Sequence, residues 1–270
     1  MGASELRIAI AGASGRMGRA LIEAVLRDPG LRLAAGLEMK GHPHVGKDAG
    51  ELAGSPCGVR ISDDVAGSIE GCDVLIDFTR PEGTIAHLAA CRKQGVRMVI
   101  GTTGLSDAQK REIAEAARGI AIAMSPNFSV GVNVAFRLIE LAARALGAGY
   151  DVEIVEAHHR AKVDAPSGTA LRMGEVVAQA LGRDLGKNAV YGRAGVTGER
   201  KDETIGFATV RGGDLVGEHT VMFIGAGERL EVTHRASSRA NFANGALRAA
   251  RFIASKKSGF FDMSDVLGLK

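Results

Sequence analysis

The sequence predicts an α/β fold, a doubly wound parallel sheet followed by a second domain of the α+β class. Up to residue 130, short apolar segments alternate with amphipathic helical segments, the order that builds a parallel sheet. Beyond residue 130, three extended segments follow one another with glycine-rich turns between them, which is typical of an antiparallel or mixed sheet.

The elements of the first part are placed by their apolar content and by their ends. Pro81 stands at the first turn of one helix and Ser106 caps another. A glycine turn, Gly12–Gly18, separates the first strand from the first helix. The expected strands are Leu6–Ala11, Leu31–Leu37, Val74–Phe78, Arg97–Ile100 and Ile120–Met124, and the expected helices are Arg19–Arg27, Pro81–Gln94 and Ser106–Arg118.

The second part is placed in the same way. Residues 182–203 lack a regular pattern and are expected to form a long loop. The last helix is expected to pack on the first domain, because an open α/β sheet needs helices on both faces. We therefore expect one domain from residues 1–130 plus 240–270 and another from 131–239. In this part of the chain, the expected helices are Val132–Leu146, Ser167–Leu181 and the last helix Asn241–Ala254, and the expected strands are Asp151–Ala157, Ile205–Arg211, Gly217–Ile224 and Glu228–Arg235.

Composition excludes several classes of protein. The chain has no apolar run long enough for a transmembrane helix and no signal-peptide pattern, so we expect a cytoplasmic protein that does not bind a membrane. Three widely spaced cysteines argue against a disulfide framework and a zinc knuckle, and no metal site is expected. A net charge of +3 and the absence of tryptophan give no sign of a nucleic-acid surface.

The glycine turn has the features of a dinucleotide site in a Rossmann-like domain. Gly12, Gly15 and Gly18 follow a strand and open a helix, so the backbone can approach a pyrophosphate at the helix N-terminus. Glu38 ends the second strand, 20 residues after Gly18, where an acidic side chain binds ribose hydroxyls. The spacing G-x-x-G-x-x-G departs from the usual motif, and a glycine turn without a ligand is the alternative.

The choice between NADH and NADPH depends on the residues around Glu38. Its charge opposes a 2′-phosphate, whereas Arg16 and Lys40 are close enough in sequence to attract one. Met39, which follows Glu38, cannot bind a phosphate. We expect NADH to work and NADPH to be usable as well.

The segment Glu156–Ala170 carries the strongest chemical signal. His158, His159 and Lys162 precede a Pro-Ser-Gly-Thr sequence in which Ser167 starts a helix. Backbone N–H groups at a helix N-terminus attract anions, a lysine adds positive charge, and a histidine can donate a proton near neutral pH. We expect this segment to hold an anionic substrate and protonate it. A hydrogen-bonded structural pair of histidines and a zinc-binding pair are the alternatives, although adjacent residues on a strand point to opposite sides.

Five stretches of the chain resemble the dihydrodipicolinate reductase family of lysine and diaminopimelate biosynthesis, also called 4-hydroxy-tetrahydrodipicolinate reductases. They lie in order along most of the chain, and the last is highly specific. The stretches are Gly12–Gly18, Asp77–Pro81, Gly101–Gly104, Ser125–Asn133 and Glu156–Ala170.

The resemblance implies an enzyme that reduces a cyclic dicarboxylate with NADH, NADPH or both. It implies a homotetramer with an N-terminal dinucleotide-binding domain and a C-terminal domain for substrate binding and oligomerisation. It also implies that His158 is the general acid, that Lys162 assists it, and that His159, Lys162 and the Gly168–Thr169 backbone hold a carboxylate. Family members often have histidine where this chain has Ala161, and members that use NADPH well often have arginine where it has Met39.

Further contacts are expected from strand ends and the helix start. Ser167 and Thr103 are additional candidates for the substrate, and Arg239, just before the last helix, is a candidate for the cofactor cleft. The full set of expected cofactor contacts is Gly12, Ala13, Ser14, Gly15, Arg16, Met17, Glu38, Phe78, Arg80, Gly101, Thr102, Thr103, Ser125, Pro126, Asn127, Phe128 and Arg239.

Two other functions remain open from the sequence. One is an NAD-dependent dehydrogenase of another amino or imino acid, which would keep the cofactor site without the dicarboxylate specificity. The other is a dinucleotide sensor that catalyses nothing, although a sensor has no need of a proton donor beside an anion site.

Overall fold

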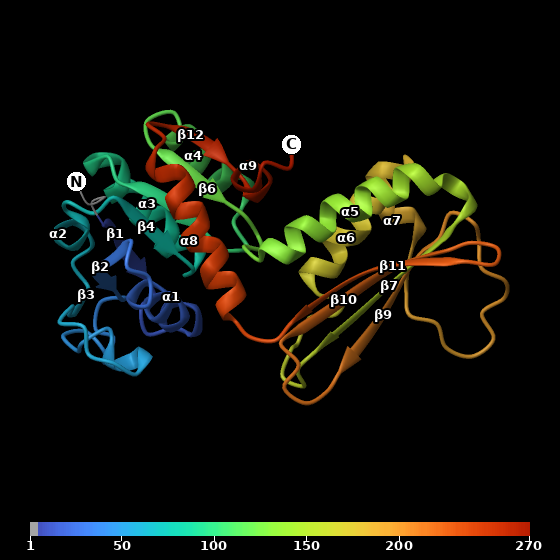
Figure 1. Cartoon of the computed structure of the whole chain (residues 1–270), viewed down its shortest axis with the longest axis horizontal. Helices are drawn as coiled ribbons and strands as arrows, with labels where there is room; N and C mark the ends of the chain where they lie inside the picture. The colour runs from blue at the N-terminus through green and yellow to red at the C-terminus, as the bar shows by residue number, and fades with distance from the viewer. Residues whose placement is uncertain (1–4) are drawn as a thin grey trace. The chain divides into compact units, whose positions relative to one another are not determined.

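The structure is a computed structural model that describes residues 5–270, and it forms two compact units (Figure 1). The first unit consists of Met1–Val130 and Arg239–Lys270, and the second of Gly131–Ser238. Arg239 falls in the first unit, one residue away from the expected boundary, because it is the N-cap residue of the last long helix.

The first unit contains a seven-stranded sheet in the order β12-β6-β5-β4-β1-β2-β3, and the paired strands are parallel. The chain moves outward from β1 in one direction through β2 and β3 and in the other through β4, β5 and β6, so the switch point of the topology lies beside β1. The strands are β1 (Leu6–Ala11), β2 (Leu31–Leu37), β3 (Ile61–Ser62), β4 (Val74–Asp77), β5 (Arg97–Ile100), β6 (Ala121–Met124) and β12 (Gly259–Phe261).

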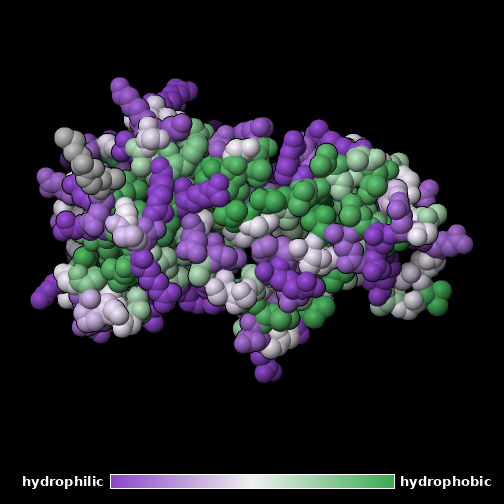
Figure 2. All heavy atoms as spheres, in the orientation of Figure 1, coloured by the Kyte–Doolittle hydropathy of each residue, from purple (hydrophilic) through white to green (hydrophobic). Residues whose placement is uncertain are grey.

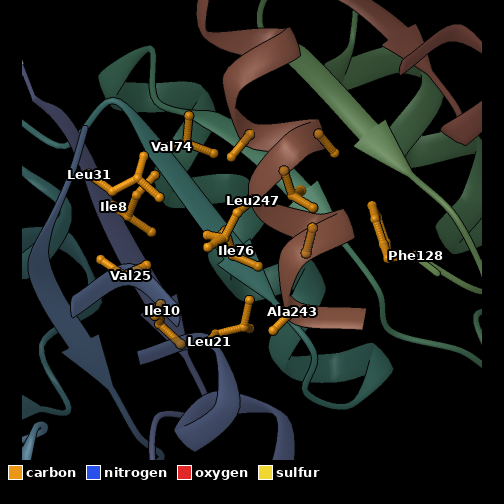
Figure 3. Packing of buried hydrophobic residues seen from close by; sticks show 14 of the residues in the cluster. Ile8, Ile10, Leu21, Val25, Leu31, Val74, Ile76, Phe128, Ala243 and Leu247 are labelled. Atoms are coloured by element: carbon orange, nitrogen blue, oxygen red, sulfur yellow. The ribbon is translucent and has the colours of Figure 1, made fainter. Parts of the chain in front are cut away.

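Helices cover both faces of this sheet, as the sequence predicts. Alternate residues of β1 enter two different cores, since Ile8 packs in the cluster with α1 and α8 while Ala9 packs in the cluster with α3 and α4. Figure 3 shows Leu247 of α8 lying against Ile76 of β4. The helices are α1 (Arg16–Leu26), α2 (Val65–Ile69), α3 (Pro81–Gln94), α4 (Asp107–Ala116), α8 (Ala240–Ala254) and α9 (Met263–Leu267), with a 3₁₀ turn η1 (Glu51–Ala53).

Two features of the first unit differ from the expectation. Helix α1 begins at Arg16 rather than Arg19, so Gly18 lies inside the helix and not in the turn. A β-carbon on Gly18 would collide with the Gly12 carbonyl oxygen, so close packing of the loop on the helix is what requires glycine there. The short elements η1, β3, α2, β12 and α9 have too few residues for periodicity to reveal them; β12, for example, exists because it pairs with β6.

The second unit contains a five-stranded mixed sheet in the order β11-β10-β7-β9-β8. Central strand β7 is antiparallel to β10 and parallel to β9. Apolar residues of this sheet pack with α5 and α6 in one buried cluster. The elements are α5 (Val130–Leu146), η2 (Gly147–Gly149), β7 (Asp151–His158), α6 (Gly168–Leu181), α7 (Leu185–Asn188), β8 (Ala189–Tyr191), β9 (Ile205–Arg211), β10 (Gly217–Ile224) and β11 (Arg229–Ala236).

The expectation of a long loop over residues 182–203 is partly wrong. The segment begins with helix α7 and continues as strand β8, which pairs in parallel with β9. The Tyr191 ring lies 5.1 Å from the Phe207 ring, centroid to centroid, and this contact supports the edge strand. A strand of three residues is too short to show an alternating apolar pattern in the sequence, so only its pairing with β9 reveals it.

The close contact between α8 and the segment after β6 gives a prediction about stability. A β-carbon on Gly245 of α8 would collide with the Phe128 carbonyl oxygen, so Gly245→Ala is expected to lower the free energy of unfolding by about 1–3 kcal/mol. Gly119→Ala is the matched control, because its β-carbon would lie at an ordinary 3.7 Å from the nearest atom, the Ala116 carbonyl oxygen. Urea denaturation of both variants measures the difference, and equal stabilities would contradict the packing described.

Candidate active site

The loop between β1 and α1 presents backbone N–H groups at a helix N-terminus. Gly12 has a φ of +68°, and the Gly15 N–H donates to the Gly12 carbonyl at 3.0 Å, which closes a tight turn. The N-cap residue is Gly15, which has no side chain to cap the helix, and the first turn of α1 holds no acidic residue. A helix start with these properties accepts an anionic group.

Glu38 lies beside this loop, at the end of β2. Its Oε1 accepts hydrogen bonds from the Ser14 backbone N–H at 2.9 Å and from Ser14 Oγ at 2.5 Å. Burial alone would raise the pKa of Glu38, but the bonds from Ser14, the nearby His42 and the Met39 N–H together outweigh it, and the pKa lies below its usual value. The carboxylate is therefore ionised, and its charge opposes a phosphate at the same place. Met39 and Lys40, which follow it, are exposed.

Three further loops follow the carboxyl ends of β4, β5 and β6, which are neighbours in the sheet. Asp77, fully buried at the end of β4, joins the first two of these loops. It accepts bonds from the Thr79 N–H at 2.8 Å and from Thr102 Oγ1 at 3.3 Å. The Phe78 ring packs so closely against Gly101 that a β-carbon on residue 101 would collide with the ring. These loops are among the stretches predicted from the sequence, whereas the role of Asp77 in joining two of them is visible only in the structure.

The predicted cofactor residues divide into those that reach the surface and those that do not. Phe128 is 1% exposed and its ring packs edge-on against Phe78, with centroids 5.5 Å apart. Thr102 is buried, and Ser125 Oγ donates to the Asn127 carbonyl at 2.8 Å. These three side chains make their contacts inside the protein. Phe128, Thr102 and Ser125 can therefore offer a ligand mainly their backbone N–H and carbonyl groups. The exposed members are Gly15, Arg16, Arg80, Thr103, Pro126 and Arg239, and the half-buried ones are Gly12, Ser14, Met17, Glu38, Phe78, Gly101 and Asn127, while Ala13 is buried.

In the second unit, a buried carboxylate organises the end of β7. Glu156 is 1% exposed, and it accepts a hydrogen bond from His158 Nδ1 at 2.6 Å. Arg211 of β9 donates to both of its oxygens, at 2.7 and 2.8 Å. The Ser167 backbone N–H and Thr209 Oγ1 donate to Oε1 at 3.1 and 3.2 Å. His158 and the start of α6, which the sequence predicts to act together, are joined through this one side chain.

Three residues at this site are not among the site residues predicted from the sequence: Glu156, Arg211 and His219. Glu156 lies two positions before His158 on the same strand face, and that spacing was the available signal. Arg211 and His219 are brought in by strand register, because Arg211 is opposite His158 and His219 is opposite Glu156. No local pattern in the sequence reveals that register.

Burial lowers the pKa of His158 below its ordinary value of about 6.5. The bond to Glu156 counteracts this in part, whereas Lys162 and Arg211 lower the pKa further. Because the ordinary pKa already lies below 7, the lowered pKa makes the neutral imidazole the main form of His158 at pH 7 in the free protein. A bound anion would raise the pKa again, because it favours the charged form.

Lys162 and Ser167, two of the predicted substrate ligands, each have a hydrogen-bond partner within the protein. Lys162 Nζ is bound to the exposed Asp164 carboxylate, at 2.7 and 2.9 Å from its two oxygens. Ser167 is buried: its Oγ caps α6 by accepting from the Ala170 N–H and lies 2.9 Å from His219 Nε2. An incoming carboxylate can replace an exposed partner such as Asp164 at little cost, but Ser167 acts within the fold.

The other predicted substrate residues lie near the same segment or in the first unit. Gly168 is exposed and is the first residue of α6, followed by the half-buried Thr169. His159 is half-buried, and its backbone N–H donates to the Leu215 carbonyl at 2.8 Å. Thr103 is exposed in the loop after β5. Among residues 5–270, no group of three or more His, Cys, Asp or Glu side chains is arranged to hold a metal ion.

The comparisons with known proteins cover both units. Residues 6–128 match the family described as "Dihydrodipicolinate reductase, N-terminus", and residues 131–267 match "Dihydrodipicolinate reductase, C-terminus". The chain belongs to the dihydrodipicolinate reductase family. The resemblance that the sequence motifs indicated is thereby confirmed.

Curated relatives and a solved structure agree with this membership. A protein of Nitrosospira multiformis named 4-hydroxy-tetrahydrodipicolinate reductase is 64% identical over 99% of both chains. One of the same name from Dechloromonas aromatica is 66% identical over 99% of this chain and all of its own. The structure titled "Dipicolinate bound Dihydrodipicolinate reductase from Paenisporosarcina sp. TG-14" is 26% identical, with a TM-score of 0.77 over 97% of this chain and 99% of that chain. The predicted fold class, a Rossmann-like parallel sheet with a second α+β domain, is confirmed as well.

His219 gives a prediction about the pH dependence of stability. Burial lowers its pKa to about 3 in the folded protein, against about 6.5 in an unfolded chain. Below pH 6.5 the unfolded chain takes up a proton that the folded protein does not, so stability is full above that pH and falls as the pH drops toward 3. At pH 5 this loss is about 2 kcal/mol.

The His219→Gln variant should therefore lose about 2 kcal/mol less than the wild type between pH 7 and pH 5. Denaturant titrations of both proteins at the two pH values measure the difference. A loss of the same size in the variant would show that His219 does not remain neutral in the folded state.

Proposed function

We propose that this protein reduces 4-hydroxy-tetrahydrodipicolinate to tetrahydrodipicolinate, with NADH or NADPH as the reductant, in lysine and diaminopimelate biosynthesis. The observation that carries the proposal is similarity over 99% of the chain, at 64% identity, to a reductase of that name. The site supports it independently, since a histidine, a lysine and a helix start are what an anionic ring would need for binding and protonation.

The residues of the first unit fit a dinucleotide. The uncapped start of α1, with Gly12, Ala13, Ser14, Gly15, Arg16 and Met17, would hold the pyrophosphate, and Glu38 the adenine ribose. The nicotinamide end would lie at the loops of Phe78 and Arg80, of Gly101, Thr102 and Thr103, and of Ser125, Pro126, Asn127 and Phe128, with Arg239 beside it. The reduced nicotinamide supplies the hydride.

The residues of the second unit bind and protonate the substrate. His159, Lys162 and the backbone N–H groups of Gly168 and Thr169 hold one carboxylate. The negative charge of the dicarboxylate raises the pKa of the neutral His158, which takes up a proton from water. The imidazolium then donates that proton from Nε2 as the ring accepts the hydride, and the 4-hydroxyl group leaves as water, so that hydride uptake, proton uptake and loss of water together convert the substrate to the product.

The proposal includes a homotetramer in the cytoplasm. Within the second unit, α5 carries Val134, Leu138 and Leu141 on one exposed stripe, and Leu141 is 63% exposed. Figure 2 shows apolar side chains gathered along this helix. An uncovered apolar stripe of this kind supports contact with another copy of the chain. No helix within residues 5–270 has the length and apolar character of a membrane span.

The assignment of His158 is tested by His158→Gln, which preserves size but cannot donate a proton as an acid. We expect kcat to fall by about 10²–10⁴-fold with a much smaller change in KM.

The Lys162→Ala variant should lower kcat and raise KM, because Lys162 both binds the substrate carboxylate and assists His158 in the proton transfer. The assay follows the loss of nicotinamide absorbance with substrate made freshly by the preceding synthase. A His158→Gln variant with near wild-type kcat would refute the acid assignment, and cofactor binding without any turnover would favour the sensor.

The choice of cofactor is tested by comparing NADH with NADPH in the wild type and in Glu38→Gln. We expect the variant to raise KM for NADH by about tenfold, since it loses a charged acceptor, and to raise KM for NADPH less, since it also loses the repulsion of the 2′-phosphate. A wild-type protein that binds NADPH at least about tenfold more tightly than NADH would contradict the role given to Glu38.

A further inference from the structure

We propose that Glu156 is a positioning residue for the reaction: it fixes the tautomer and orientation of His158 and ties the proton donor to the anion-binding start of α6. This inference rests on the proposed function, in which His158 is the acid. It adds a residue two positions before the acid, on the buried face of β7, whose side chain does not reach the surface.

The contacts of Glu156 place it between the proton donor and the anion site. One oxygen accepts from His158 Nδ1 at 2.6 Å, and the other accepts from the Ser167 N–H at 3.1 Å. Ser167 is the N-cap residue of α6. Any shift of the carboxylate would therefore move the imidazole and the helix start together.

A carboxylate at this position decides which nitrogen of His158 exchanges the proton. An ionised carboxylate only accepts hydrogen bonds, so Nδ1 must carry its hydrogen and Nε2 becomes the reactive atom. Gly217 of β10 packs close to Nε2, since a β-carbon at that position would lie 2.9 Å from the nitrogen. With Nδ1 held by Glu156, Nε2 is the nitrogen left to give the proton to a substrate.

The charges around His158 make Glu156 necessary for the charged form of the acid. Lys162 from the loop after β7 and Arg211 from β9 oppose a positive imidazole, and His219 from β10 also lies against the ring, at 5.0 Å between centroids. Glu156, from the same strand, favours the imidazolium. Burial by itself would raise the carboxyl pKa of Glu156, but the hydrogen bonds and charges of Arg211 and His158 together outweigh burial and keep the carboxyl ionised.

The competing explanation is that Glu156 is only half of a structural ion pair with Arg211. Glu153 provides a matched control, since it lies three positions earlier on the same strand and is also bound by arginines. Arg193 donates to its two oxygens at 2.9 Å each, and Arg200 donates at 3.0 Å. None of the contacts described for Glu153 involves a histidine, so Glu153→Gln perturbs a comparable ion pair without touching the acid.

The kinetic experiment compares Glu156→Gln with Glu153→Gln in the full-length enzyme. We expect Glu156→Gln to lower kcat by about 10–100-fold with little change in KM, the size of effect seen when the partner of a functional histidine is removed. The alkaline limb of its kcat–pH profile should move to lower pH, because loss of the carboxylate lowers the pKa of the imidazolium. Glu153→Gln should keep wild-type kcat within about twofold and keep the wild-type profile.

A second readout needs no turnover. Histidine labelled with ¹⁵N in the ring reports the tautomer and the titration of His158 by NMR, and the signal is assigned by its absence in His158→Gln. We expect the wild type to carry hydrogen on Nδ1, and Glu156→Gln to lose that preference and to titrate at lower pH.

The outcomes separate this inference from the proposed function. If His158→Gln abolishes turnover while Glu156→Gln keeps the wild-type kcat, profile and tautomer, Glu156 is not a positioning residue although the function stands. Equal losses of kcat in Glu156→Gln and Glu153→Gln, without a change in the His158 signal, would likewise reduce Glu156 to a structural role. If the wild type does not reduce the dicarboxylate at all, the proposed function fails, and the NMR titration still decides whether Glu156 controls His158.

Discussion

The Glu156 carboxylate, buried at the end of β7, is the constraint on which the chemistry of the second unit depends. A buried carboxylate is costly unless its oxygens are fully hydrogen-bonded. Here the donors come from β7 itself, from both Thr209 and Arg211 of β9, and from the start of α6. The requirement to satisfy this charge fixes the relative positions of the imidazole and the helix N-terminus, which are the two features an anionic substrate would meet.

The first unit uses the same physical solution at a different place. Asp77 is fully buried at the carboxyl end of β4, and it accepts hydrogen bonds from Thr79 and Thr102 in two neighbouring loops. His87 of α3 is also bonded to it, with Nδ1 2.8 Å from the carboxylate. In each unit, a buried acidic side chain near the end of a strand thus binds a loop or a helix start to the sheet.

Burial also changes the chemical state of the acid in a way that suits its proposed role. A permanently charged His158 next to Lys162 and Arg211 would be repelled by both, and the free protein avoids this by holding the imidazole neutral. In the proposed reaction, a dianionic ligand would supply the missing negative charge, so protonation of His158 would be coupled to arrival of the ligand. The pair of Lys162 with the exposed Asp164 fits the same proposal, because a substrate carboxylate could displace the Asp164 carboxylate at little cost.

Local patterns in the sequence were enough to determine the fold class, most long helices and strands, and the motifs that establish the family. The reason is that apolar periodicity, caps and glycine turns act over a few residues and can be read along the chain. The same patterns named His158, Lys162 and Glu38. Tertiary structure alone decided that Arg211 and His219 lie beside His158, that Phe128 and Ser167 face inward, and that His158 is neutral. Strand register, burial and charge pairing join residues distant in the chain, and these non-local contacts set both which atoms meet and how strongly each group holds its proton.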